Sequence, residues 1–297
     1  MSSTMQQESS GNKNSQSVRF FTYGMFHGKN ETVGSDYLRA LQLIKYWDEA
    51  ELYKYGENPD VLIFNKVFCG EDYQFPKHFE NIKILDICDP MWIEGHAVVQ
   101  TAQAMDAVTC TTENLAEFIR QFKKEVYVVP DRFDLELLPK PKVHTEQAKS
   151  VVWFGYSHNA ELLKPAIGKL ESLGLNLIII SNDDPIANRW GLRDKKEYYT
   201  FVKYNEATIY QELQKADFAI LPDGARPEDY FKSNNKTIKA NLAGLPVAKT
   251  AEDVDLYMKA ENRRKWYDEN YATIKAEYDV RKSIEQYKVI IAMIAGK

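Results

Sequence analysis

Residues 151–159 read Val-Val-Trp-Phe-Gly-Tyr-Ser-His-Asn, a continuous apolar run that gives way to a glycine and small polar residues. Four apolar residues without polar alternation are typical of a parallel strand that is buried on both faces. Helical spacing follows over Ala160 to Leu173, and a second apolar strand is expected over Leu175 to Ile180. This order of strand, helix and strand predicts a βαβ unit in a parallel sheet.

The same alternation extends outward through most of the chain. Apolar runs predict further strands over Val18 to Tyr23, Val61 to Phe64, Ile82 to Ile87, Ala107 to Cys110, Val126 to Val129, Tyr199 to Val202, Phe218 to Leu221 and Pro246 to Ala248. Helical patterns lie over Asp36 to Tyr46, Glu113 to Phe122 (capped by Thr111 or Thr112), Thr237 to Ala243, and from Ala251 to the end. We therefore expect an α/β protein with two Rossmann-like parallel-sheet domains facing a cleft.

A break in the pattern places the domain boundary. Pro130 to Ala148 carries three prolines among charged residues and shows no sustained period, as expected of a linker. We expect a disordered tail over residues 1–17 and domains over residues 18–140 and 141–275. A final helix over 276–297 has an apolar stripe and can cross back to the N-terminal domain.

The composition is that of a globular chain of 297 residues, 44% hydrophobic and 27% charged, with a net charge of −5. This balance does not favour binding of nucleic acid by charge alone, although a local basic patch is compatible with it. Three widely spaced cysteines without a Cys-x-x-Cys pair predict reduced thiols. No apolar run reaches the roughly 18 residues of a membrane helix, and the tail lacks the apolar stretch of a signal peptide, so a cytoplasmic protein without an integral membrane segment is expected.

In doubly wound sheets, ligands bind beyond the carboxyl ends of the strands. The loop from Gly24 to Gly34 follows the first expected strand. Gly28 and Gly34 permit close backbone approach, so the loop and the next helix can face a phosphate. Its spacing matches neither G-x-G-x-x-G nor the Walker loop, and a strand-to-helix turn without a ligand is equally open.

The loop after Ile82 to Ile87 gathers polar side chains near one strand end. These are Asp86, Asp89, Trp92, Glu94 and His96. Carboxylates can accept hydrogen bonds from sugar hydroxyls, and a tryptophan ring offers a face for sugar C–H groups. The alternative is that Asp89 or Glu94 caps a helix and that His96 lies on an exposed turn.

Two loops of the second half can hold an anion. Gly155, Tyr156, Ser157, His158 and Asn159 follow a strand and either cap the next helix or face an anion at its N-terminus. After the strand over Phe218 to Leu221, three cations flank the start of a helix: Arg226, Lys232 and Lys236. Three cations suit a diphosphate, whereas the alternative is an exposed basic loop.

Other motifs favour structural interpretations. Asp253-Val-Asp255 has the D-x-D form of metal-dependent sugar transferases but is more typical of a helix cap and dipole pair. Arg263 to Trp266 suggests an exposed helix face with one buried ring. Hydrolase triads and spaced His/Cys sets are missing from the sequence, so no metal site is predicted.

The stretches Ala216 to Pro222, Lys232 to Lys236 and Ala243 to Val247 resemble, in this order, the donor-binding region of retaining GT-B glycosyltransferases of family 4. Ala107 to Thr112 with Leu115, and Val128 to Pro130 with Asp134, resemble segments before the hinge of the same family. The resemblance implies an acceptor side in the N-terminal domain and a donor nucleotide side in the C-terminal domain.

One departure from that family concerns its Glu-x7-Glu pair, whose second glutamate holds the ribose hydroxyls of the nucleotide. Counting back from Gly244, the two positions are Phe231 and Lys239, and neither is acidic. A lysine cannot accept hydrogen bonds from a ribose, though it can meet a phosphate. The diphosphate site therefore resembles the family more closely than the nucleoside site does.

The resemblance implies transfer of a sugar from a nucleotide-sugar donor, with retention, without a metal and without a further cofactor. The catalytic candidates are Asp89, His96, Arg226 and Lys232. The donor-binding candidates are Gly28, Gly155, Tyr156, Ser157, His158, Lys232, Ser233, Asn234, Asn235 and Lys236. The acceptor is open between a glycan, a lipid-linked sugar, a protein and modified DNA. Alternatives are a catalytically degenerate GT-B protein that binds a sugar nucleotide or partner, and a nucleotide-sugar epimerase of the same fold.

Overall fold

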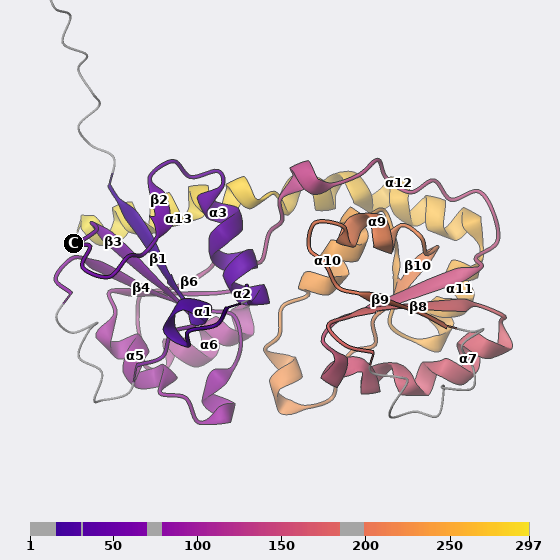
Figure 1. Cartoon of the computed structure of the whole chain (residues 1–297), viewed down its shortest axis with the longest axis horizontal. Coiled ribbons are helices and arrows are strands. Elements are labelled where there is room, and N and C mark those ends of the chain that lie inside the picture. Colours follow the sequence, from indigo (N-terminus) through magenta and orange to yellow (C-terminus); the bar gives the residue numbers. More distant parts are fainter. Residues whose placement is uncertain (1–15, 31, 70–78, 185–198, 297) are drawn as a thin grey trace, which may run out of the picture. The chain divides into compact units, whose positions relative to one another are not determined.

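The computed structural model describes residues 16–30, 32–69, 79–184 and 199–296. The chain divides into two compact units (Figure 1). Unit 1 comprises Met1–Val129 and Ile284–Lys297, and unit 2 comprises Pro130–Ser283. Each unit contains one sheet of parallel strands, which confirms the α/β class with two Rossmann-like domains.

The sheet of unit 1 has six strands in the order β2-β1-β3-β4-β5-β6. Their bounds are β1 (Val18–Thr22), β2 (Ala50–Leu52), β3 (Val61–Asn65), β4 (Ile82–Ile87), β5 (Ala107–Cys110) and β6 (Val126–Val128). Five of them confirm the predicted strands. β2 was not predicted, because two of its three residues are exposed and it carries too little apolar pattern.

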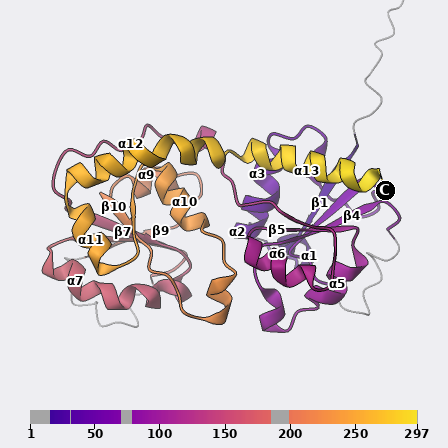
Figure 2. The same ribbon diagram turned by 180° about the vertical axis from the view of Figure 1, so that it is seen from behind.

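The helices of unit 1 cover both faces of this sheet. They are α1 (Tyr23–Phe26), α2 (Gly34–Asp36), the π-helical turn η1 (Tyr37–Leu41), α3 (Gln42–Ile44), the 3₁₀ turn η2 (Met91–Glu94), α5 (Val98–Ala104) and α6 (Glu113–Arg120). Both views place α3 on the face opposite α5 and α6 (Figures 1 and 2). Thr112 caps α6 as predicted, because its hydroxyl accepts a hydrogen bond from the Leu115 N–H at 3.3 Å.

A buried ion pair lies at the centre of unit 1. Asp86 is fully buried in β4 and accepts hydrogen bonds from Arg39 (3.0 and 2.6 Å), Asn65 (2.9 Å), Thr109 (2.7 Å) and Tyr287 (2.9 Å). Burial alone would raise the pKa of its carboxyl, but the Arg39 guanidinium and these hydrogen bonds hold it below the usual value. The expectation that Asp86 belongs to a sugar-facing cluster is therefore wrong, since its side chain is fully buried and both carboxylate oxygens accept hydrogen bonds from neighbouring side chains.

The sheet of unit 2 has five strands in the order β11-β10-β7-β8-β9. Their bounds are β7 (Ser150–Phe154), β8 (Asn176–Ser181), β9 (Tyr199–Lys203), β10 (Phe218–Ile220) and β11 (Val247–Ala248). All five confirm predicted strands to within two residues at either end.

Two predicted helices of the second half are divided in the structure. The one over Ala160 to Leu173 becomes η4 and α7, and the one from Ala251 to the end becomes α11, α12 and α13. The helices of unit 2 are η3 (Leu135–Leu137), η4 (Ser157–Ala166), α7 (Ile167–Ser172), α9 (Ile209–Leu213), η6 (Pro227–Tyr230), α10 (Asn235–Leu242), α11 (Ala251–Met258), α12 (Ala260–Glu277) and the first residues of α13 (Val280–Ala295). η4 is a 3₁₀ helix that contains Pro165, which has no N–H to donate. Both views place α7 on the face opposite α9 and α12 (Figures 1 and 2).

In each sheet the strand order changes direction at one pair of neighbouring strands, so that later strands are added on opposite sides of this pair. In unit 1 the pair is β1 and β3, because β2 lies on one side and β4 to β6 on the other. In unit 2 it is β7 and β10, because β8 and β9 lie on one side and β11 on the other. Ligands of open α/β sheets bind beyond the carboxyl ends of such strand pairs. The segments that follow these four strands are therefore the places to look for a site.

Candidate functional site

The first segment of the site in unit 2 follows β7. Gly155 has a φ of +153°, and a Cβ at this position would lie 3.5 Å from the Lys236 ammonium and from the Trp153 ring. Tyr156 is the N-cap of η4, and its side chain makes no capping hydrogen bond. The alternative that Ser157, His158 or Asn159 caps this helix is therefore wrong, and these polar residues are left for another use.

The second segment follows β10 and holds a carboxylate between two cations. Asp229 accepts hydrogen bonds from the Arg226 backbone N–H (3.1 Å) and side chain (3.2 Å), and from the Lys232 ammonium (2.6 Å). Its carboxylate packs on Gly224, where any Cβ would lie 1.9 Å from a carboxylate oxygen. Burial would raise the pKa of Asp229, but hydrogen bonds and charge from Arg226 and Lys232 bring it well below its usual range. Arg226 also donates to the Asn159 side chain at 3.1 Å, so the two segments are in contact.

Lys236 supplies the third predicted cation, and its environment differs from that of the other two. Within the described ranges its ammonium makes no hydrogen bond and no ion pair, while it lies against Gly155. Burial lowers its pKa, and the charges of Lys232 and Arg226 lower it further against a smaller opposing effect of Asp229. A partly buried ammonium without a partner attracts an anion more strongly than an exposed, paired one.

His158 lies in the segment between Gly155, which is next to the Lys236 ammonium, and Asn159, which binds Arg226. Burial, followed by the charges of Arg226, Lys232 and Lys236, lowers the pKa of its imidazole. The ring is exposed to solvent and stacks on Tyr156 with centroids 5.7 Å apart and planes 13° apart. The structure thus brings together the predicted residues after β7 and after β10. Their contacts define a cationic cluster made of Gly155, His158, Arg226, Lys232 and Lys236.

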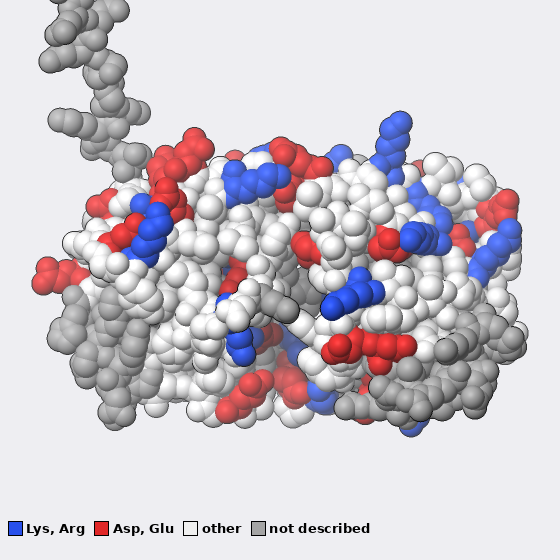
Figure 3. Space-filling model, in the orientation of Figure 1, with Lys and Arg blue, Asp and Glu red and all other residues white. Residues whose placement is uncertain are grey.

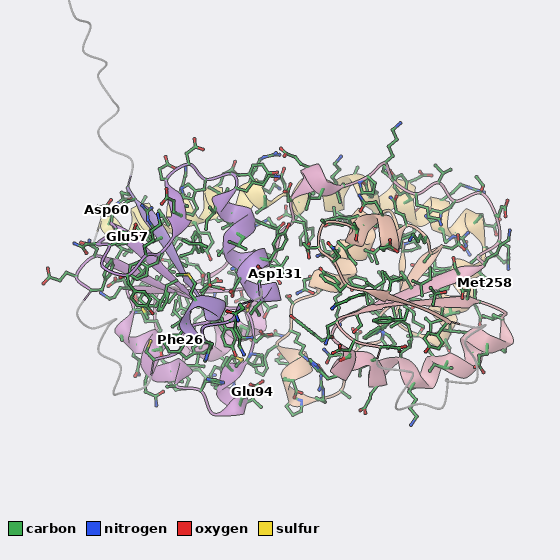
Figure 4. The ribbon with its side chains drawn as sticks, in the orientation of Figure 1. Phe26, Glu57, Asp60, Glu94, Asp131 and Met258 are labelled. Carbon is green, nitrogen blue, oxygen red and sulfur yellow. The ribbon has the colours of Figure 1, made fainter. Side chains whose placement is uncertain are left out.

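The segment between these cations is held by a residue that was not predicted. The Ser233 hydroxyl donates to Asp131 at 2.6 Å, and the Asn235 amide donates to the same carboxylate at 3.4 Å. Asp131 is buried beside them in unit 2 (Figure 4). Asn234 is the N-cap of α10 and makes no side-chain capping bond. Ser233 and Asn235 therefore anchor the loop in this structure, and their donor-binding roles, like that of Asn234, stay predictions.

Lys239 occupies the position where the resembled family has its second glutamate. Its ammonium donates to both Glu206 oxygens (2.7 and 3.0 Å) and to the Tyr204 hydroxyl (2.9 Å), and it lies 5.6 Å from the centroid of the Phe133 ring. Lys239 is 5% exposed. Its charge is therefore neutralised inside unit 2 by a glutamate from another element, the loop after β9.

In unit 1 the segments after β1, β3 and β4 also meet. Lys66, directly after β3, donates to Asp89 at 2.5 Å, and its ammonium lies 5.4 Å from the centroid of the Tyr23 ring. Burial would lower the pKa of Lys66, but Cys88 and Asp89 raise it above the ordinary lysine value. Lys66 was not predicted as a site residue. Its signal in the sequence is its place as the first residue after a buried strand.

Two further candidates of unit 1, Glu94 and His96, lie close to each other. The Nε2 atom of His96 lies 3.9 Å from a carboxylate oxygen of Glu94. The pKa of His27 is lowered by burial first, then by Lys29 and by His96. Pro90 caps η2 without a side-chain bond, and α5 has Ala97 as its N-cap, so the capping alternative for Asp89 and Glu94 is wrong.

Trp92 and Gly28 are two other candidates of the first half whose local structure is described. Trp92 stacks on Phe118 with centroids 4.0 Å apart, so one of its faces is covered. Gly28 has a φ of +59° in the turn after α1, and it belongs to unit 1 whereas the cationic cluster belongs to unit 2. A role for Gly28 in donor binding stays a prediction.

For two motifs the sequence favoured a structural interpretation, and the structure confirms it for Asp253-Val-Asp255 but not for Arg263. Asp253 forms a capping box with Thr250, and Asp255 pairs with Lys169 at 2.7 Å, which confirms the structural interpretation of the D-x-D motif. The basic stretch on α12 is not simply an exposed face. Arg263 is 1% exposed and donates to His144 and to three backbone carbonyls, so that expectation is wrong for this residue.

Charge is distributed without a dominant sign over the face in Figure 3, where lysines and arginines alternate with aspartates and glutamates. Among the described residues no group of three or more His, Cys, Asp and Glu side chains is placed to hold a metal ion. None of the helices in the described ranges has the length and hydrophobicity needed to cross a bilayer.

Solved structures with the same architecture show which fold this is. A glycosyltransferase from Rickettsia africae ESF-5 matches with a TM-score of 0.59 at 9% identity, over 94% of this chain and 98% of that one. TarM matches with 0.57 at 14% identity over 78% of this chain, which spans about half (54%) of TarM. AviGT4, a glycosyltransferase involved in avilamycin A biosynthesis, matches with 0.52 at 13% identity over 82% of this chain and 77% of its own.

These similarities establish the fold as that of the GT-B glycosyltransferases. The expected fold class is thereby confirmed, while membership of family 4 stays a prediction. At the level of sequence, no protein-family model and no curated protein matches the chain.

Proposed function

We propose that the chain is a glycosyltransferase that moves a hexosyl or pentosyl group from a nucleotide-sugar donor to an acceptor, with retention and without a metal ion or further cofactor. The observation that carries the proposal is the Lys236 ammonium, which lies against Gly155 beyond the neighbouring strands β7 and β10. It makes no hydrogen bond or ion pair with the residues that the structure describes. An anion is the ligand that such a cation attracts, and this edge of a doubly wound sheet is where ligands bind.

In this proposal the donor diphosphate binds at the cationic cluster of unit 2. Lys236 meets one phosphate directly, and the backbone at Gly155 leaves room for it because no Cβ is present. Arg226 and Lys232 share their charge between Asp229 and the ligand. Negative charge develops on the leaving diphosphate as the bond to the sugar breaks, so three cations around it stabilise the transition state.

Asp89 and His96 in unit 1 serve the acceptor side of the proposed reaction. Lys66 holds one Asp89 oxygen, and Asp89 is 37% exposed. A carboxylate presented in this way can accept a hydrogen bond from an acceptor hydroxyl. We propose an acceptor with free hydroxyls, which keeps a glycan, a lipid-linked sugar, a protein and modified DNA as candidates.

The first test is a thermal-shift screen of the purified protein against nucleoside diphosphates and nucleotide sugars. A ligand that binds the folded state raises the melting temperature by mass action. We expect one nucleotide class to give a shift, and Lys236→Ala to weaken its binding by about 10- to 100-fold, the loss of one charge-assisted hydrogen bond. Lys265→Ala is the matched control, because Lys265 is 73% exposed on α12.

Each outcome bears on a different part of the proposal. No shift with any nucleotide in the wild-type protein would contradict a nucleotide donor. A shift that survives Lys236→Ala would contradict the diphosphate site. Binding with no transfer to a broad panel of acceptors would instead support a degenerate binding protein, and release of an epimerised sugar without an acceptor would support an epimerase.

A further inference from the structure

His158 is the one member of the cationic cluster whose charge can change near neutral pH, because an imidazole has an unperturbed pKa of about 6.5. Two contacts place its neighbours in the sequence beside cations of the cluster. The neighbouring Asn159 binds Arg226 at 3.1 Å, and Gly155, three residues earlier, lies against the Lys236 ammonium. The ring itself is exposed and lies beside Tyr156, so a ligand can reach it.

The charges that face His158 come from three elements. Arg226, Lys232 and Lys236 act on it from the loop after β10 and the start of α10. Two acidic side chains, Glu228 and Asp229, pair with Arg226 at 3.1 and 3.2 Å, and Glu161 on η4 also acts on Arg226. Because these carboxylates are engaged by Arg226 and Lys232, the net effect on the imidazole is that of the cations.

We infer that His158 is a proton-dependent fourth cation of this site, neutral in the free protein and protonated when a diphosphate binds among Arg226, Lys232 and Lys236. This inference rests on the proposed diphosphate site and adds a proton to its chemistry. The physical reason is that the electrostatic effect of the surroundings on the His158 imidazolium changes from unfavourable to favourable when the ligand binds. Three cations without a ligand oppose the imidazolium, whereas two phosphate groups placed among them outweigh their charge and favour it.

Linkage gives the consequence for binding. If the complex holds a proton that the free protein lacks, the affinity for diphosphate rises as the pH falls through the interval between the free and bound pKa values of His158. The imidazolium also adds a donor for a phosphate oxygen. The site therefore distinguishes diphosphates from uncharged sugars more strongly at pH 6 than at pH 8.

The test uses inorganic pyrophosphate with EDTA to remove divalent ions, and follows the histidine Cε1–H signals by NMR across pH 5.5 to 8.5. Absence of the signal in His158→Gln assigns His158. We expect saturating pyrophosphate to raise the pKa of His158 by about one unit or more, the shift typical of a nearby opposite charge. The signal of His144, which is buried in unit 2 and bonded to the Gly244 carbonyl, is expected to stay where it is.

Calorimetry provides the second measurement, because pyrophosphate itself exchanges protons. Titrations in buffers with different ionisation enthalpies give the number of protons taken up, and the difference between wild type and His158→Gln belongs to His158. We expect wild type to take up more protons and to gain about tenfold more affinity than His158→Gln between pH 7.5 and 5.5. Lys265→Ala, altered at an exposed residue of α12, is the control and should behave like wild type.

The outcomes separate this inference from the proposed function. Pyrophosphate binding with an unmoved His158 titration, or with equal proton uptake in His158→Gln, overturns the inference and leaves the diphosphate site in place. Failure of pyrophosphate and of every nucleoside diphosphate to bind at any pH overturns both.

Discussion

Lys66 is the one non-glycine residue in the described ranges with a positive φ, +54°. The left-handed conformation costs an ordinary residue roughly 1 kcal/mol, and such residues persist where their surroundings hold them. Here the backbone N–H donates to the Asp86 carbonyl at 2.9 Å, and the ammonium binds Asp89. The strain is thus tolerated at the place where a charged side chain is brought to the carboxyl end of the sheet.

Replacing Lys66 with alanine and with glycine separates the backbone from the side chain. Both variants lose the ammonium and its ion pair with Asp89, but only glycine adopts a positive φ without strain. We expect Lys66→Gly to be more stable than Lys66→Ala by about 1 kcal/mol, measured by urea unfolding. Equal stability of the two variants would mean that no strain is stored at this position.

The residues of the site could be predicted from the sequence more readily than the partners to which they bind. Gly155, His158, Arg226, Lys232 and Lys236 were predicted because they lie in the segments between a buried strand and the next helix, and parallel strands bring such segments to one edge. Their partners were not. Asp229 was not identified as the carboxylate between Arg226 and Lys232, although it lies only three residues from each. Asp131 reaches Ser233 across 102 residues of sequence, a pairing that depends on the tertiary structure.

At the scale of elements, the His144 imidazole links the segment after Pro130 to two other parts of unit 2. The His144 Nε2 lies 2.9 Å from the Gly244 carbonyl, so it donates, and Nδ1 accepts from the Arg263 guanidinium at 3.2 Å. This pair of bonds requires the neutral ring. Burial lowers the pKa of His144, and the charges of Arg263 and Lys142 lower it further, although the hydrogen bond to Gly244 opposes them.

A lowered histidine pKa in the folded state makes unit 2 less stable in acid. Below about pH 7 the unfolded chain binds the proton that the folded state refuses, so the free energy of unfolding falls as the pH drops through 6.5. We expect this slope, measured by urea unfolding with hydrogen exchange on peptides from β10 and α10, to be reduced in His144→Gln. His96→Gln, altered in unit 1, should retain it, and an unchanged slope in His144→Gln would contradict the neutral-ring account.

The elements themselves were predicted best where the pattern is local. The strands over Ile82 to Ile87 and Ala107 to Cys110, and the cap at Thr112, depend on apolar runs and capping chemistry that neighbouring residues supply. Arg263 was misjudged for the opposite reason. A guanidinium is buried where enough acceptors meet it, and two acceptors of Arg263, the His144 ring and the Glu146 carbonyl, lie more than 110 residues earlier in the chain.

At the scale of the whole molecule, unit 1 is discontinuous in sequence. Its sheet is built before Pro130, but Ile284–Lys297 returns to it after the whole of unit 2. Tyr287 is fully buried in unit 1 and contacts the rings of Phe20 and Trp47, with centroids 6.4 and 6.1 Å away. Its hydroxyl completes the set of donors to Asp86. The final helix is thus part of the core of unit 1.

Removal of the chain after Ser283 should therefore unfold or loosen unit 1 while sparing unit 2. The deletion removes four buried side chains: Ile284, Tyr287, Ile290 and Ile291. Burial of an aliphatic or aromatic side chain contributes about 1.5–3 kcal/mol, so the loss is comparable with the whole stability of a domain. Hydrogen exchange should show lost protection in β1 and β3 to β5, with β7 and β8 still protected.

Two point variants distinguish packing from hydrogen bonding in this effect. Tyr287→Phe keeps the ring and removes only the hydroxyl donated to Asp86, so we expect a loss of about 1–3 kcal/mol in unit 1. Val289→Ala is the matched control, because Val289 is 60% exposed on the same helix. Because the Asp86 carboxylate is fully buried, the loss in Tyr287→Phe should exceed that in Val289→Ala. Full protection of unit 1 in the truncated chain would show that its sheet is stable without the returning helix.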